Sequence, residues 1–107
     1  VEKSFLMNQL HHFSEGLYAK EMELKEGSFA VQHKHKYDHL SILAKGRVRV
    51  LFDGELSKEY VAPACITIIK DINHAVYALE DSVWFCIHAT SETDVAHIDK
   101  VLIKEEV

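Results

Sequence analysis

The segment GSFAVQHKHKYDHLSILAKG, residues 27–46, carries the most informative pattern in the chain. His33 and His35 are two residues apart in a β-like run, so their side chains point to the same face. His39 follows after a three-residue break, which allows the chain to turn and the third ring to return to the same interior. The segment therefore predicts imidazoles that converge on one point from a fixed backbone.

Short apolar runs separated by turn residues extend on both sides of this segment, from about residue 17 to residue 90. Asp53-Gly54 is a strong signal for a type I′ hairpin turn. The segments HLSILAKG, residues 39–46, and RVRVLFDG, residues 47–54, are predicted to form two strands of a hairpin that turns at Gly46. Strands of this length and density indicate an all-β sandwich or barrel.

The two ends of the chain leave alternatives open. In residues 4–14, apolar side chains at helix-like spacing predict a helix that Ser4 would cap and Gly16 would end, with an extended arm as the alternative. Residues 91–106 are predicted to form either a capped helix or a terminal strand.

The histidine segment resembles the first motif of the cupin superfamily, G-x5-H-x-H-x3-E-x6-G. The positions filled as in the motif are those of Gly27, His33, His35 and Gly46. His39 stands at the glutamate position, as it does in some small single-domain cupins.

The second cupin motif, G-x5-P-x-G-x2-H-x3-N, is matched only at its histidine, His74. The other motif positions hold Pro63, Ile69, Asp71 and Ala78. The resemblance covers roughly residues 17–90. It implies a small antiparallel double-stranded β-barrel of the jelly-roll, cupin type, which we expect to span residues 1–107 as a single domain.

The resemblance also implies a site for one divalent transition metal ion. The expected ligands are His33, His35, His39 and His74. Imidazole suits Fe, Ni, Cu and Zn and, less strongly, Mn, so the pattern does not select among these metals. Because a histidine must be neutral to ligate, we expect binding to be lost as the pH falls through about 6. The competing interpretations are a metal-free cupin and a barrel whose histidines lie on an exposed strand, since lysines alternate with His33 and His35.

Four neutral imidazoles would leave a six-coordinate ion with its full charge and two open positions. We expect the apolar residues Ile42, Val48, Val50 and Phe85 or Trp84 to make the pocket dry. These features favour a metal-dependent dioxygenase or related oxidoreductase that acts on a small organic substrate. The alternative is a non-enzymatic module that senses a ligand or metal, and a sugar-nucleotide isomerase or epimerase is a weaker third hypothesis. Tyr37, Asp38 and Tyr77 are candidates for hydrogen bonds to the ligands, although turn and packing roles are favoured for each.

Composition limits the partners. The 107 residues carry a net charge of −5, and the 12 basic residues are scattered, which argues against nucleic acid and anionic membrane surfaces. No apolar run approaches the roughly 20 residues of a membrane span. Cys65 and Cys86 lie in apolar runs and are interpreted as reduced and buried, which favours a cytoplasmic location. We expect a homodimer, because a barrel of this size leaves strand edges open and cupins often pair through those edges or through a sheet face.

The remaining histidines are given lower weight. His88 shares strand parity with Trp84 and Cys86, so the three side chains should point to one face. If that face is the interior, Cys86 would line the pocket, although inert packing is the favoured role for this thiol. His11, His12 and His97 are predicted to lie on the surface.

Overall fold

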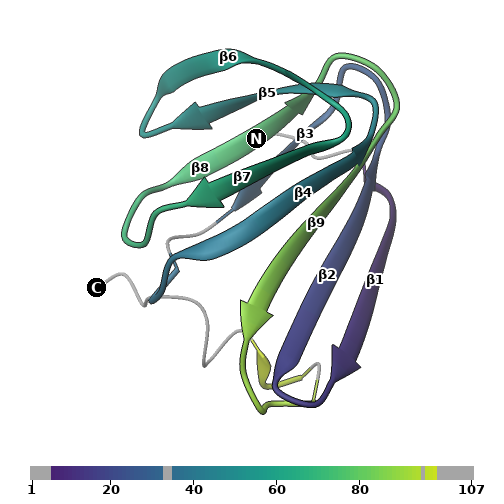
Figure 1. The fold of residues 1–107 in the computed structure, drawn as a ribbon. Coiled ribbons are helices and arrows are strands. Elements are labelled where there is room, and N and C mark those ends of the chain that lie inside the picture. The colour runs from purple at the N-terminus through teal and green to yellow at the C-terminus, as the bar shows by residue number, and fades with distance from the viewer. Residues whose placement is uncertain (1–5, 33–34, 95, 99–107) are drawn as a thin grey trace.

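The computed structural model describes residues 6–32, 35–94 and 96–98, and the regular elements that lie wholly within this part of the chain are β-strands (Figure 1). In chain order the strands are β1 (Leu6–Ser14), β2 (Leu17–Leu24), β3 (Phe29–Gln32), β4 (His39–Lys45), β5 (Arg47–Phe52), β6 (Glu55–Val61), β7 (Ala64–Ile68), β8 (His74–Ala78) and β9 (Ser82–Ala89). The all-β prediction is confirmed.

The strands form two antiparallel sheets that face each other. One sheet has the order β1-β2-β9-β4-β7 and the other β3-β8-β5-β6. Buried residues alternate with more exposed ones along β4, β5, β7, β8 and β9, and the two inner faces build one apolar core. Its largest member is Trp84, which is fully buried opposite Leu43. This is the jelly-roll arrangement that the sequence predicted.

The helix predicted over residues 4–14 is wrong, and the extended alternative is correct from Leu6 onward. β1 pairs antiparallel with β2 through a tight turn in which Gly16 has a φ of 75°. Ladder hydrogen bonds to β2 outweigh the helix-like spacing of the apolar residues. Phe13 on β1 packs against the buried Tyr18 of β2.

The hairpin predicted around Gly46 is also wrong. β4 pairs with β7 and β9, whereas β5 pairs with β6 and β8, so the chain passes from one sheet to the other at Gly46. Gly46 has a φ of 92°, and a Cβ added to it would lie 2.5 Å from the carbonyl oxygen of Asp81. By contrast, Asp53 and Gly54 both have positive φ and connect β5 to β6 as predicted.

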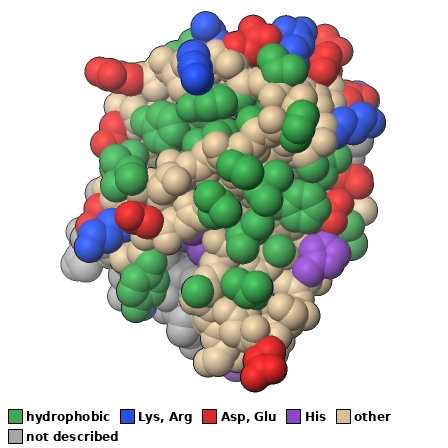
Figure 2. Space-filling model, in the orientation of Figure 1, with side chains coloured by type: hydrophobic (Ala, Val, Ile, Leu, Met, Phe, Trp, Pro, Cys, Tyr) green, Lys and Arg blue, Asp and Glu red, His purple; other side chains and the backbone are tan. Residues whose placement is uncertain are grey.

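The outer face of the five-stranded sheet carries an apolar patch. Leu40 and Ile42 of β4 lie beside Ile87 and Phe85 of β9, and all four side chains are partly or largely exposed. Figure 2 shows hydrophobic side chains gathered over the centre of this face. Cys65 of β7 pairs with Ile42 of β4, and its side chain is exposed. The prediction that both cysteines are buried is therefore wrong for Cys65.

The C-terminal prediction falls mostly outside the described residues. Of residues 91–106, the structure describes 91–94 and 96–98, and Ile98 is buried against Tyr18. Within the described ranges, no helix is both long enough and apolar enough to cross a membrane.

Candidate metal centre

Four histidines meet between the two sheets at one end of the core. His39 is the first residue of β4, His88 lies near the end of β9, and His74 opens β8 in the opposite sheet. His35 lies between β3 and β4. Leu40 pairs with Ile87 on the outer face of the sheet. The adjacent residues His39 and His88 lie opposite each other, and their side chains point to the inner face because side chains alternate along a strand.

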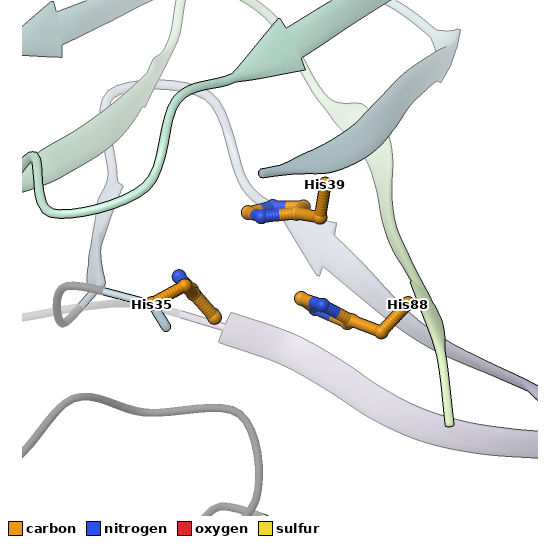
Figure 3. A group of neighbouring side chains, drawn as sticks. All are labelled: His35, His39 and His88. Carbon is orange, nitrogen blue, oxygen red and sulfur yellow. The ribbon is translucent and has the colours of Figure 1, made fainter. Parts of the chain in front are cut away.

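The rings are in mutual contact. The centroid of His39 lies 4.4 Å from that of His88 and 4.5 Å from that of His35, and the His35–His88 separation is 5.1 Å. The potential ligand nitrogens of these three residues all lie within 4.8 Å of one another (Figure 3). The ring of His74 lies farther away, 5.9 Å from His35 and 6.0 Å from His39.

All four side chains are buried, and burial disfavours the protonated form of His39, His74 and His88. Burial, together with the neighbouring His88, His35 and His74, lowers the pKa of His39 to about 2. Burial also lowers the pKa of His74 to about 4 and, with a contribution from Lys20, that of His88 to about 4. These imidazoles are therefore neutral at neutral pH, the form that binds metal, and protons should compete only below the pH of about 6 expected from the sequence.

His39 provides the test of whether the site fits a metal ion. Its side chain is 5% exposed, and neither Nδ1 nor Nε2 has a hydrogen-bond partner among the described residues. An unsatisfied buried polar group costs about 1–3 kcal/mol. Coordination of an ion through one nitrogen would offset that cost. The donor set, several neutral imidazoles on separate elements, also fits a divalent transition metal.

Hydrogen bonds fix the turn that separates His35 from His39. The backbone N–H of Asp71 donates to the carbonyl oxygen of His35 at 3.1 Å, and the N–H of Lys70 donates to Asp38 Oδ1 at 2.8 Å. Asp38 thus anchors the turn, which supports the two rings indirectly. Tyr37 is 64% exposed. Tyr77 is also exposed, on the opposite face of β8 from His74, which does not favour hydrogen bonds from either tyrosine to a ligand.

The structure brings three of the four predicted ligands, His35, His39 and His74, to one place. His33 lies outside the described residues, so its role stays a prediction. His88 joins the group although the motif comparison did not include it. The available signal was its strand parity with Trp84 and Cys86, both of which are buried on the inner face of β9.

The apolar surroundings differ in part from the prediction. Val48, Val50 and Trp84 point into the core, but Ile42 and Phe85 belong to the outer patch. The favoured packing role for Cys86 is consistent with its place in the core. This thiol is 2% exposed, and its Sγ lies 3.9 Å from the hydroxyl oxygen of Ser41.

The cluster adjoins an open cavity of about 540 Å³. Its lining residues are Lys36, Tyr37, Asp38, His88, Ala89, Thr90 and Ser91. Among the described histidines of the cluster, His88 is the one that lines the cavity. A small organic molecule in the cavity would lie next to the imidazoles, with polar groups from the 36–38 turn and from residues 90 and 91 around it.

Comparison with solved structures identifies the architecture. KdgF from Halomonas sp. superposes with a TM-score of 0.65 at 17% identity, over 80% of this chain and 79% of that chain. A cupin-2 domain-containing protein from Shewanella frigidimarina gives 0.64 at 16% identity, over 84% and 85%. The chain has the cupin fold.

A third solved structure, salicylate 1,2-dioxygenase from Pseudoaminobacter salicylatoxidans, superposes with a TM-score of 0.70 at 9% identity. The match covers 88% of this chain but 27% of the dioxygenase. No protein-family model matches the sequence, and no curated protein matches it. At these identities the likeness establishes the fold alone.

Proposed function

We propose that the chain is a metal-binding cupin that uses a divalent transition metal to oxidise a small organic molecule. The observation that carries the metal assignment is His39, whose two buried nitrogens lack hydrogen-bond partners among the described residues and lie against other buried imidazoles. The proposed ligands are His33, His35, His39 and His74, the set that the motif resemblance implies.

The chain's own residues support an oxidative role in three ways. The lowered pKa values of His39 and His74 keep these imidazoles neutral, so the bound ion would retain its charge. The apolar core beside the cluster, which includes the fully buried Trp84, excludes water from one side. The cavity beside His88 admits a substrate from the other side. When bound, a redox-active ion would supply the electron transfer that oxygen chemistry requires. The dioxygenase neighbour is consistent with this class through its fold.

The first experiment is elemental analysis of protein purified without a histidine tag, followed by thermal unfolding with added Fe, Mn, Ni, Cu or Zn. We expect about one ion per chain and a metal-dependent rise in Tm, because a ligand that binds only the folded state stabilises it. Absence of both would overturn the metal assignment. Oxygen uptake on adding Fe²⁺ with a phenol, a diketone or a thiol then tests the proposed oxidoreductase activity. Metal binding without oxygen uptake on any of these would favour the sensing module instead.

A further inference from the structure

His88 is held against the centre of the histidine cluster. Its ring centroid is 4.4 Å from that of His39 and 5.1 Å from that of His35, closer to both than the ring of His74 is. In Figure 3 the three rings of His35, His39 and His88 surround a common space. By ring distance alone, His88 is therefore better placed than His74 to bind the same ion as His35 and His39.

The nitrogen separations are compatible with a shared ion. Two imidazole nitrogens bound to one ion at about 2.1 Å can lie at most about 4.2 Å apart. The nitrogens of His35, His39 and His88 lie within 4.8 Å of one another before any ion draws them together. Small side-chain rotations would close that difference.

The ring of His88 is also held in position from behind. Tyr18, its cross-strand neighbour on β2, stacks on it at 6.0 Å with an interplanar angle of 20°. Tyr18 is itself 2% exposed, and its hydroxyl is 2.7 Å from His11 Nδ1. A ligand ring whose orientation is fixed by packing loses little freedom when it binds metal.

We propose that His88 is a metal ligand of this centre, additional to the histidines that the cupin motifs supply. This inference rests on the proposed function, because it concerns the same ion. It places a ligand at the boundary between the cluster and the cavity, so that a molecule entering the cavity meets the ion on the His88 side.

The test measures Co²⁺ affinity and the visible absorption of bound Co²⁺ in untagged protein, for the wild type and for His88→Ala and His88→Gln. We expect both variants to lose at least about 10–100-fold in affinity, the range found when even supporting residues of metal sites are changed, and to alter the Co²⁺ spectrum. His12→Ala is the matched control, because His12 is an exposed histidine of β1 that pairs with Glu21 on the outer side. It should bind as the wild type does.

A measurement on the wild type removes the dependence on variant folding. Long-range ¹H–¹⁵N spectra of the imidazoles, with and without Zn²⁺, should show a large shift of one ring nitrogen of His88. Wild-type affinity in folded His88 variants, or an unshifted His88 in a Zn²⁺-loaded wild type, would overturn the inference and leave the proposed function standing. Failure of the wild type to bind either metal would instead overturn the proposed function.

Discussion

Replacing His39 with leucine should make the metal-free protein more stable. The imidazole is buried, and its two nitrogens lack hydrogen-bond partners among the described residues. Leucine has a similar volume and no polar atom to satisfy. Because an unsatisfied buried polar group costs about 1–3 kcal/mol, His39→Leu should raise the free energy of unfolding by about that amount. For a domain of this size the Tm should rise by at least about 4 °C.

Bound metal should make the wild type more stable than the His39→Leu variant, the reverse of the order expected without metal. At a free metal concentration about 1,000-fold above Kd, the wild type should gain about 4.1 kcal/mol, whereas the variant should gain little. Urea unfolding of both proteins, first with a chelator and then with saturating Zn²⁺, measures the two differences. His12→Leu, at an exposed position, should change either value by no more than about 0.5 kcal/mol.

The result that would refute this reasoning is a chelated His39→Leu protein that is less stable than the wild type. Such a protein would mean that the imidazole makes contacts in the fold that leucine cannot replace. Its orphaned nitrogens would then no longer indicate a binding role.

Three further outcomes are expected. The metal-free protein should lose stability as the pH falls from 6.5 towards 4. In this range His74 and His88 become protonated in the unfolded chain but stay neutral in the folded protein, where their pKa values are about 4. The loss should reach at most about 1.4 kcal/mol per pH unit for each histidine, and urea titrations across this range that show no slope would contradict it. Gly46→Ala should destabilise by more than about 1 kcal/mol in thermal unfolding, since its φ is positive and the added Cβ would meet Asp81 and Ser82. We also propose a homodimer through the outer patch of the five-stranded sheet, whose uncharged centre can match a second copy of itself. Phe85→Glu should then give the 12.3 kDa monomer in light scattering, and a wild type that is already monomeric would refute the dimer.

The fold could be predicted because its signals are local and repeated. The period-two pattern of β9, with Trp84 and Cys86 on one face, follows directly from strand geometry. The type I′ signal at Asp53-Gly54 likewise fixes its own hairpin. The hairpin predicted around Gly46 was wrong because the sequence indicates a turn at this glycine but not whether the strands on either side of it pair with each other. That depends on the close approach of residues 81 and 82, which are far away in sequence.

The site was predictable where one motif defined the spacing. His35 and His39 lie in a single stretch, and the structure brings their rings to 4.5 Å. His88 could not be placed beside them from the sequence, because its position depends on the register between β4 and β9, a contact between strands distant in the chain. The hydrogen-bonding state of His39 also depends on everything packed around it, which no local pattern reports.

A metal ion in the histidine cluster would also hold the two sheets of the fold together. His39 and His88 belong to one sheet and His74 to the other, and the apolar core lies between the two sheets. An ion held by all three would act as a reversible cross-link across the sandwich, closing long chain loops as a disulfide does. With the ion bound, separation of the two sheets during unfolding would require breaking coordination bonds as well as exposing the core. Backbone amides of β8 would then exchange with solvent far more slowly in the loaded protein than in the empty one.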